Sequence, residues 1–238
     1  MDKDTANIRK DIYKISVDEV YEALGTSPQG LTQAQAEQRQ KEEGKNLIDE
    51  KKKESTILIF LASFTHLMAI LLWVGGAVAF VAGMPQLGIA IWLVNIINGV
   101  FSFWQEYRAG KATDALKNML PSYVRVIRDG KEEKILAEDL VVGDIILLEE
   151  GDKISADARL VGCNDLQVNQ STLTGESNPV SKINDSILKN NLTRAEIPNL
   201  IFAGTSVSAG NGKAVVIEIG MKTEFGKIAD LTQNMKKE

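Results

Sequence analysis

The residues best suited to chemistry lie in one short stretch, Leu173-Thr174-Gly175-Glu176-Ser177. Gly175 can adopt backbone angles that are closed to other residues, which lets the main chain turn tightly and approach a ligand. Pro179 fixes its own backbone and favours an extended Asn178, so we expect an exposed loop. A carboxylate pointing outward at Glu176 could orient and deprotonate a water molecule. The same residues also suit an ordinary Gly-Pro surface turn with no chemical role.

Other kinds of catalytic site find little support in the chain. No Gly-rich run ends in Gly-Lys-Ser or Gly-Lys-Thr, so a P-loop is not expected. His66 is the only histidine, and therefore no histidine-based dyad fits. Cys163 is the only cysteine, which excludes an intrachain disulfide and a cysteine-based metal site, and it suits a small buried hydrophobic position. The net charge of -5 gives no reason to expect nucleic-acid binding.

Short strands are expected on both sides of the loop and should position it. The expected strands cover residues 123–128, 134–136, 144–148 and 158–161, with Asp129-Gly130 as a hairpin turn. We interpret residues 204–219 as a second hairpin around Asn211-Gly212. Many short strands with Gly and Asp turns predict a small β sandwich or roll. A helix from about Glu224 to Met235 should follow.

Two short helices are expected near the amino terminus, after a polar, partly ordered tail at residues 1–15. The stretch Ser16-Val17-Asp18-Glu19 has the pattern of a capping box, in which the first and last side chains satisfy free amides of a helix. That helix should end before Gly25. A second capping box is expected at residues 32–35, and Gly44 should end its helix.

The strongest pattern in the chain is a run from Ser55 to Gln105 without Asp, Glu, Lys or Arg. A membrane-spanning helix needs about 20 mainly apolar residues. The run is long enough for two spans, expected at residues 57–81 and 87–107 with a turn at residues 83–86. Helices are expected because every backbone amide must be satisfied internally in lipid. A buried hairpin of a soluble protein is the alternative.

The charges flanking this run predict its orientation. Lys51 to Lys53 precede the first span, whereas Arg108 and Lys111 follow the second. Positive charge favours the cytosolic side, so both ends should be cytosolic. After the second span, an amphipathic pattern up to Pro121 predicts a helical stalk or a solvated helix end.

Three polar residues, His66, Asn95 and Asn98, interrupt the apolar run. They could mark an ion path or hydrogen-bond a neighbouring helix, and the second interpretation is favoured.

The loop and several further blocks together resemble the P-type cation-transporting ATPases, whose actuator domain carries this Thr-Gly-Glu-Ser signature. The other matching blocks are Val142-Gly143-Asp144, residues 150–157, 202–205, 210–214 and 220–227, in this order along the chain. Gly30-Leu31-Thr32 with Glu37, Arg39, Gly44 and Asn46 is similar to the amino-terminal cytosolic segment of these pumps.

The resemblance implies an α+β membrane protein: a two-helix transmembrane hairpin plus a cytosolic, β-rich actuator domain, a distorted jelly roll, with short amino-terminal helices. The implied parts are a cytosolic helical segment at 1–54, the hairpin with its stalk at 55–121 and the actuator domain at 122–223. A helix at 224–238 would lead towards a third membrane span.

By the same resemblance, the loop acts on an aspartyl phosphate. Glu176 would position the attacking water and accept its proton, while Thr174, Gly175 and Ser177 shape the loop. The complete pump would use ATP and Mg²⁺, but the Asp-Lys-Thr-Gly-Thr motif and the nucleotide-binding domain are absent here. This chain alone is therefore expected to bind neither and to be inactive.

The implied partners are the lipid bilayer, the phosphorylation and nucleotide-binding domains, the remaining membrane helices and the transported cation. The implied location is the cell membrane, with several passes. A free-standing, membrane-anchored β domain with a binding or regulatory role is the alternative. The sequence does not identify the cation.

Three positions depart from the family pattern. Asn169 and Gln170 stand where relatives commonly carry two acidic residues, and Ser155 stands where proline is common. None of these changes removes Glu176. The absence of Cys-X-X-Cys modules argues against the heavy-metal branch of the family.

Overall fold

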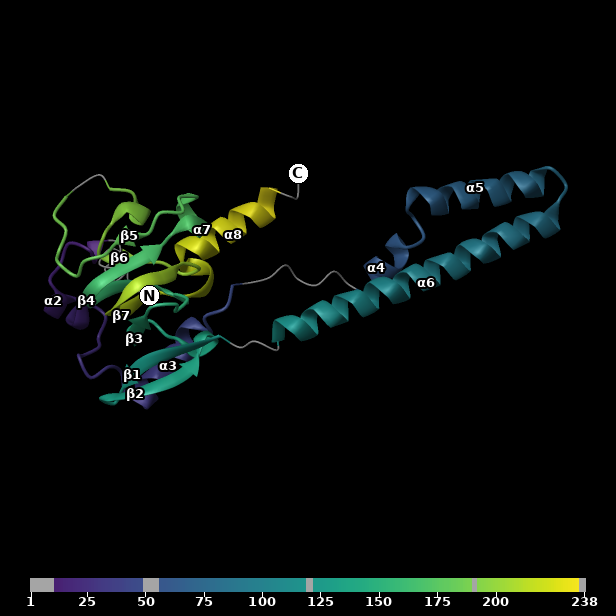
Figure 1. Ribbon diagram of the computed structural model, residues 1–238. Helices are drawn as coiled ribbons and strands as arrows, with labels where there is room; N and C mark the ends of the chain where they lie inside the picture. The colour runs from purple at the N-terminus through teal and green to yellow at the C-terminus, as the bar shows by residue number, and fades with distance from the viewer. Residues whose placement is uncertain (1–10, 49–55, 119–121, 190–191, 236–238) are drawn as a thin grey trace. The chain divides into compact units, whose positions relative to one another are not determined.

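A computed structural model describes residues 11–48, 56–118, 122–189 and 192–235, and its elements are labelled in Figure 1. The chain divides into a β-rich unit, residues 1–49 with 121–238, and a helical unit, residues 50–120. The sequence of the helical unit is thus inserted into that of the β-rich unit. The three lysines expected to flank the first span, Lys51 to Lys53, lie outside the described residues.

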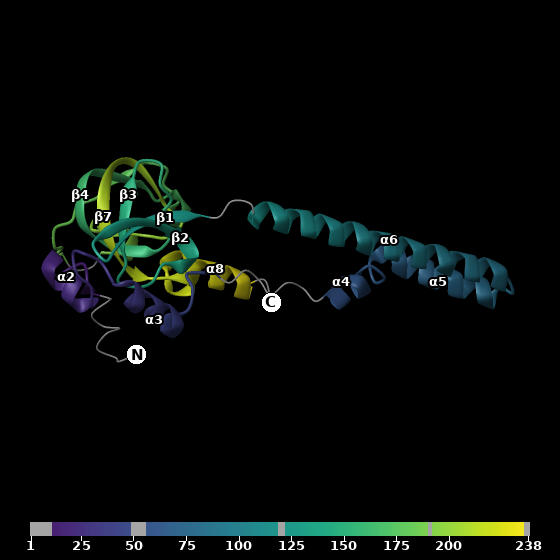
Figure 2. The ribbon, with the colours of Figure 1, turned by 90° about the horizontal axis from the view of Figure 1, so that it is seen from below.

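In the described part of the β-rich unit there are seven strands. They are β1 (Tyr123–Arg128), β2 (Lys131–Leu136), β3 (Ile145–Glu149), β4 (Asp157–Asn169), β5 (Val180–Ser181), β6 (Leu200–Ile201) and β7 (Ser206–Glu218). All pairs are antiparallel, in the order β2-β1-β3-β7-β4-β5, with β6 also on β4. Figure 2 shows how strongly this sheet curves. One continuous sheet matches the expected roll and not a sandwich of two separate sheets.

The first hairpin confirms its sequence signal. Arg128 pairs with Lys131 across Asp129 and Gly130, which have φ angles of 50° and 71°. Positive φ at both central residues is the geometry that Asp-Gly favours in two-residue hairpins.

The second hairpin, expected around Asn211-Gly212, is wrong. These residues lie inside β7, where Asn211 pairs with Glu149 of β3 and with Asn164 of β4. The glycine next to them, Gly210, has φ 76°, opposite an irregularity in β4 between Asn164 and Gln167. The Asn-Gly signal therefore coincides with a bulge in a central strand, and β7 continues through it.

The core lies along β3, β4 and β7. Ile146, Leu160, Val215 and Ile217 are completely buried there. β4 is also much longer than the four residues expected, because it continues past bulges as far as Asn169.

Helices α2 (Val17–Ala23) and α3 (Gln33–Glu43) confirm both expected capping boxes. The segment expected to be a polar, partly ordered tail, residues 1–15, is packed against the β-rich unit in its described part, residues 11–15. Ile12 is completely buried, and its carbonyl accepts a hydrogen bond of 3.3 Å from Arg159 Nε. A buried guanidinium thus fixes this segment in place.

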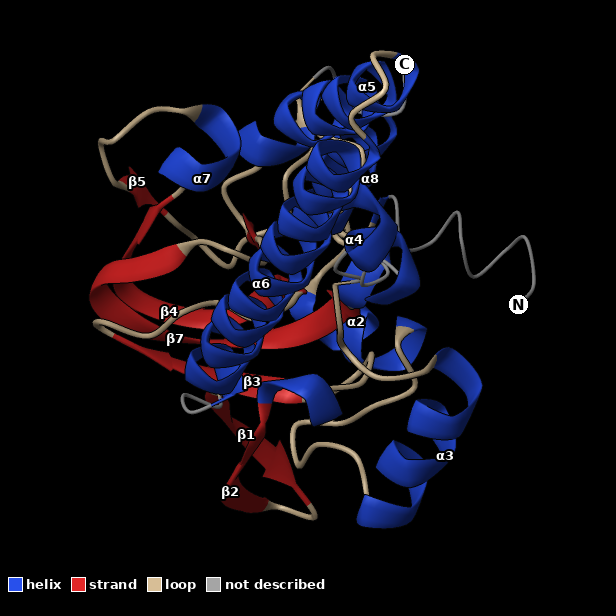
Figure 3. Cartoon of the chain, turned by 90° about the vertical axis from the view of Figure 1, so that its right-hand side faces the viewer, coloured by secondary structure: helices blue, strands red, loops and turns tan. Residues whose placement is uncertain are grey.

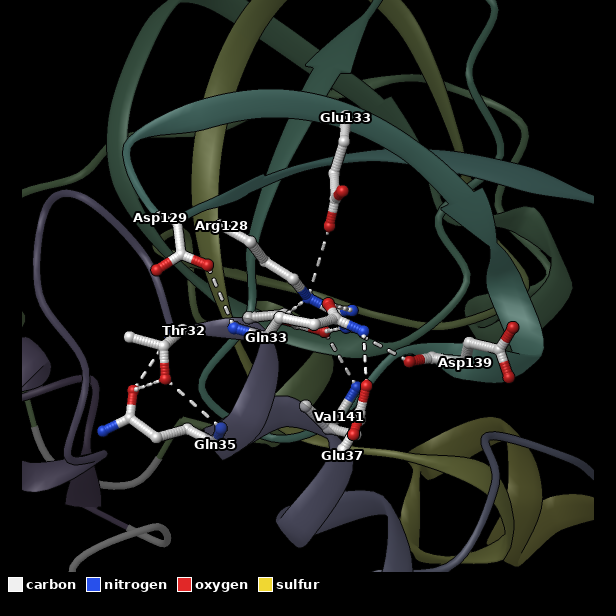
Figure 4. Close-up of polar contacts among 10 residues, drawn as sticks. Thr32, Gln33, Gln35, Glu37, Arg128, Asp129, Glu133, Asp139 and Val141 are labelled. Carbon is white, nitrogen blue, oxygen red and sulfur yellow. Dashed lines mark hydrogen bonds and ion pairs between the residues drawn. The ribbon is translucent and has the colours of Figure 1, made fainter.

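A buried ion pair lies beneath α3, between β1 and the residue that precedes β3. Arg128 donates to both carboxylate oxygens of Asp144, at 2.9 and 2.7 Å. Arg128 also reaches Gln33 of α3 and the Asp139 carbonyl, as Figure 4 shows. Burial opposes the charge, but the hydrogen bond and the negative charge of Asp144 keep the pKa of Arg128 above its usual value.

The helical unit contains α4 (Thr56–Ala62), α5 (Leu67–Val81) and α6 (Pro85–Asn118). The prediction that the first span is one continuous helix over residues 57–81 is wrong, because residues 63–66 interrupt the helix. The break sits where Ser63, Thr65 and His66 replace apolar side chains. The Thr65 hydroxyl donates to carbonyls of the preceding turn, at 3.3 and 3.4 Å.

Within the described residues one helix, Pro85–Ala109, is long and apolar enough to cross a membrane by length and composition. α5 is apolar but shorter. It packs on α6, where Trp92 Nε1 donates to the Trp73 carbonyl at 3.1 Å. Asn95 is buried and donates to the Ala69 carbonyl at 3.2 Å, which supports a packing role for this residue.

α6 confirms that the helix continues past residue 107. The side chains of residues 112–118, on which the amphipathic stalk pattern rests, lie outside the description. Asn98, expected to face a partner helix, is exposed.

The bulge in β7 yields a test of the corrected topology. A Cβ added at Gly210 would lie 2.3 Å from the Asp165 carbonyl oxygen, whereas one at Gly151, φ 89°, would meet nothing within 4 Å. Both alanine variants carry left-handed strain of about 1–2 kcal/mol. We expect Gly210→Ala to lower the free energy of unfolding by about 1–3 kcal/mol more than Gly151→Ala.

Urea unfolding of the two variants in the same detergent, followed by circular dichroism, measures this difference. Equal losses would mean that residue 210 lies in an open turn, as a hairpin requires.

Candidate functional site

The candidate loop connects two paired strands at one end of the sheet. Val168 of β4 pairs with Val180 of β5, and the chain between them forms a one-turn helix, α7 (Ser171–Thr174), before the loop (Figure 3). The loop therefore starts and finishes on neighbouring strands.

Gly175 performs the turn expected of it. Its φ and ψ are 77° and -7°, which places it in the left-handed region directly after α7. Its amide donates to the Ser171 carbonyl at 2.9 Å and so closes the helix. A side chain would be strained here although the space around it is open.

The Thr174 hydroxyl fixes the start of the loop. It donates to the Gln170 carbonyl at 3.2 Å and accepts from the Glu176 amide at 3.2 Å. Glu176 and Ser177 are exposed, as expected. Within the described residues the Glu176 carboxylate makes no hydrogen bond or ion pair. The loop thus holds the Glu176 backbone and leaves its side chain available.

Asn169 and Gln170, noted in the sequence as departures from the family pattern, support the loop from below. The Asn169 side chain accepts a hydrogen bond of 2.9 Å from the Ser171 amide. Gln170 is only 1% exposed and donates to the Ala195 carbonyl at 3.2 Å. Asparagine ahead of a short helix is a recognisable capping signal, but no sequence signal pointed to the burial of Gln170.

A second support is the turn at residues 202–205. The Thr172 hydroxyl donates to the Gly204 carbonyl at 2.9 Å. In the same turn, the Ala203 amide donates to Asp157 Oδ1 at 2.9 Å. The other carboxylate oxygen of Asp157 accepts a hydrogen bond from the Glu224 amide, also at 2.9 Å. Asp157 is completely buried, and burial raises its pKa to about 6 against the two hydrogen bonds, which favour the charged form.

Lys182 follows β5 and is 4% exposed. Burial lowers its pKa to about 8. Its ammonium lies 5.9 Å from the centre of the Phe202 ring and has no hydrogen-bond partner among the described residues. This charge is therefore destabilising where it stands.

The described residues contain no group of three or more His, Cys, Asp or Glu side chains that could hold a metal ion. What the site offers chemically is one exposed carboxylate, one exposed serine hydroxyl and exposed main chain on an anchored loop. Such a set can orient and deprotonate water at a group brought to it.

Comparison with known proteins finds two matching families. Residues 118–233 match the P-type ATPase actuator domain, and residues 12–79 match the cation transporter/ATPase amino terminus. The first match contains the candidate loop, and the second covers α2, α3 and most of α5.

Similar curated proteins include a calcium-transporting ATPase of Bacillus subtilis, 37% identical over 91% of this chain and 24% of the relative. The sodium/potassium-transporting ATPase subunit alpha of Drosophila melanogaster is 35% identical over 94% of this chain and 23% of the relative. The calcium-transporting ATPase 1 of Lactococcus lactis is 36% identical over 93% of this chain and 25% of the relative. The chain spans about a quarter of the length of these relatives.

The unpaired charge of Lys182 gives a stability prediction. The folded chain releases this proton near pH 8, whereas an unfolded lysine keeps it until its pKa of 10.5. The unfolded state therefore binds more protons between about pH 8 and 10.5, so stability should rise with pH in this window. Lys182→Met should raise the free energy of unfolding by about 1–3 kcal/mol at pH 7, and the gain should shrink above pH 8.

Hydrogen exchange of the core amides of β7, measured from pH 7 to 10, tests this expectation. The exposed Lys189→Met variant is the control and should change little. A loss of stability in Lys182→Met at pH 7 would contradict the prediction, because it would show that the charge is stabilised.

Proposed function

Because the chain belongs to the P-type ATPases, we propose that it is the amino-terminal part of an ATP-driven cation pump. In this proposal the loop of Thr174, Gly175, Glu176 and Ser177 promotes hydrolysis of an aspartyl phosphate formed on another domain. The observation that carries the proposal is the Glu176 carboxylate, which is exposed and has no partner among the described residues, on a loop fixed by hydrogen bonds on both sides of Gly175.

The proposed reaction is attack of water on phosphorus. Glu176 orients the water and takes one of its protons as the oxygen–phosphorus bond forms. The bond from phosphorus to the aspartate oxygen breaks, and the aspartate carboxylate and inorganic phosphate are the products. General-base assistance of this kind is typically worth about 10²–10⁴-fold in rate.

The other loop residues have supporting roles in the proposal. Gly175 turns the chain, and Thr174 holds its direction through the two hydrogen bonds of its hydroxyl. Ser177 is exposed directly after Glu176 and can face the phosphate. ATP and Mg²⁺ serve the complete pump through its nucleotide-binding and phosphorylation domains, and this chain alone is proposed to bind neither.

The helical unit is proposed to cross the membrane twice, with α5 and α6 as the two passes and both ends in the cytosol. Support comes from the charge-free run between Ser55 and Gln105 and from the close packing of α5 on α6. Helix α8 (Glu224–Met235) is proposed to lead towards a further span of the complete pump.

The loop proposal predicts a specific kinetic defect. In the complete pump that contains this chain, Glu176→Gln keeps the size of the side chain but removes the base. Phosphoenzyme should form from ATP at a nearly normal rate, because phosphorylation uses other domains. Its decay after a chase with unlabelled ATP should slow by about 10²-fold or more.

Glu150→Gln is the control, since Glu150 is also an exposed carboxylate in a turn but lies far from the loop in sequence. It should decay like the wild type. Unchanged decay in Glu176→Gln would refute a role in the chemistry and favour a binding or regulatory module.

The membrane proposal predicts which residues an impermeant reagent can reach. Single cysteines are placed at Gln86 and Ser186, both exposed, in a Cys163→Ser background. In intact cells an impermeant maleimide should label position 86 and leave position 186 unlabelled until the cells are opened. Labelling at 186 but not at 86 would reverse the proposed topology.

A further inference from the structure

The candidate loop and helix α8 are joined through one buried carboxylate. Asp157 accepts the Ala203 amide on one oxygen and the Glu224 amide on the other, each at 2.9 Å. Glu224 is the first residue of α8, and Ala203 belongs to the turn that supports α7. The Asp157 side chain therefore connects the 202–205 turn to the start of α8, although the whole of β7 lies between them in the sequence.

The turn at residues 202–205 is tightly built and transmits this contact. The Thr205 hydroxyl donates to the Phe202 carbonyl at 2.6 Å, and the Gly204 amide donates to the Ile154 carbonyl at 2.9 Å. Gly204 has φ 81°, and a Cβ there would lie 2.9 Å from the Phe225 ring of α8. The turn thus packs on α8 directly as well as through Asp157.

A second route runs beside the first. Gln170, at the base of α7, donates to the Ala195 carbonyl. The neighbouring Arg194 forms an ion pair with Glu224, with Nε 3.2 Å from the carboxylate. Both routes begin at α7 and finish at the first residue of α8.

The start of α8 is itself firmly held. Thr223 is completely buried, donates to the Gly220 carbonyl at 2.7 Å and accepts from the Gly226 amide at 3.0 Å. A Cβ at Gly226 would lie 2.5 Å from the Gly220 carbonyl oxygen, so the backbone packs too closely here for any side chain at residue 226.

We propose that Asp157 is a positioning residue that couples the candidate loop to α8, so that a displacement of α8 carries Glu176 with it. The proposal rests on the proposed function for its consequence in catalysis, but the coupling itself is a property of the β-rich unit. Asp157 touches no reacting atom in this account and acts through the turn and α7.

Two substitutions interrupt the coupling at different points. Asp157→Asn keeps the shape but replaces one acceptor oxygen by an amide that cannot accept the N–H facing it. Thr172→Val removes the hydroxyl that holds the Gly204 carbonyl, and Thr172 is exposed, so folding should not depend on it. Asp152→Asn is the matched control, because Asp152 also accepts a main-chain amide, that of Glu149 at 2.8 Å, in a different turn.

The first measurement is amide hydrogen exchange on this 238-residue chain in detergent. Asp157→Asn should speed exchange at the amides of Glu224, of Thr174 in α7 and of Gly175 directly after α7 by about tenfold or more, while the β1–β2 hairpin stays protected. Asp152→Asn should leave α7 unchanged. Unaltered α7 exchange in Asp157→Asn, or equal loosening of every strand, would overturn the coupling and leave Asp157 with a merely structural role.

The second measurement is phosphoenzyme turnover in the complete pump. Asp157→Asn and Thr172→Val should slow phosphoenzyme decay by about tenfold, since small misplacements of a catalytic group are costly, and should leave phosphoenzyme formation unchanged. A merely structural defect would lower both steps together.

Glu176→Gln separates the two ways of failing. If Glu176→Gln slows decay and Asp157→Asn does not, the positioning role is refuted and the proposed function stands. If Glu176→Gln decays normally, the proposed function fails and the catalytic consequence of the coupling fails with it, while hydrogen exchange still decides whether Asp157 couples α7 to α8.

Discussion

The β-rich unit depends on the burial of two charged side chains, Asp157 and Arg159, two residues apart on β4. Neither forms an ion pair with a buried partner of opposite charge among the described residues, so main-chain groups must compensate both. Asp157 receives two amides, from Ala203 and Glu224. Arg159 donates to the carbonyls of Ile12, Ile15, Leu160, Asn184 and Asp185.

Burial still costs free energy at both positions, which lowers the pKa of Arg159 to about 10 and raises that of Asp157 to about 6. The segments that supply the carbonyls and amides come from four distant parts of the chain. Any of them that moved away would leave a buried charge uncompensated, a penalty of several kcal/mol. Hydrogen bonds to these two buried charges, and not apolar contact alone, therefore hold four segments to β4: the amino-terminal segment, the loop after β5, the 202–205 turn and α8.

The distance along the chain between a residue and its partners explains which features the sequence could predict. Capping boxes, the Asp129-Gly130 turn and helix 224–235 depend on neighbours within a few residues, and all are found where expected. The left-handed Gly175 belongs to the same class. The bulge at Gly210, the packing of Ile12 and the burial of Gln170 depend on partners far along the chain, for which no local pattern exists. Asn211-Gly212 misled because a turn and a bulge favour the same residue types.

In the candidate loop, the residue that fixes the backbone, Thr174, differs from the residue proposed to react, Glu176. Thr174 gives its only hydroxyl hydrogen to the Gln170 carbonyl and uses its oxygen for the Glu176 amide. In this geometry Thr174 has no hydroxyl hydrogen left for a phosphate oxygen, and its oxygen holds the Glu176 amide instead. Donors for an incoming anion must then come from exposed groups further along, namely Ser177 and the free main chain of the loop. The Glu176 carboxylate, proposed as the base, is left without such a bond among the described residues, because a partner within its own unit would compete with water for it. An exposed Glu176 on an anchored backbone therefore fits a base that meets its substrate on the surface of a second domain. That surface would also exclude water from the carboxylate, and the proposed hydrolysis depends on it.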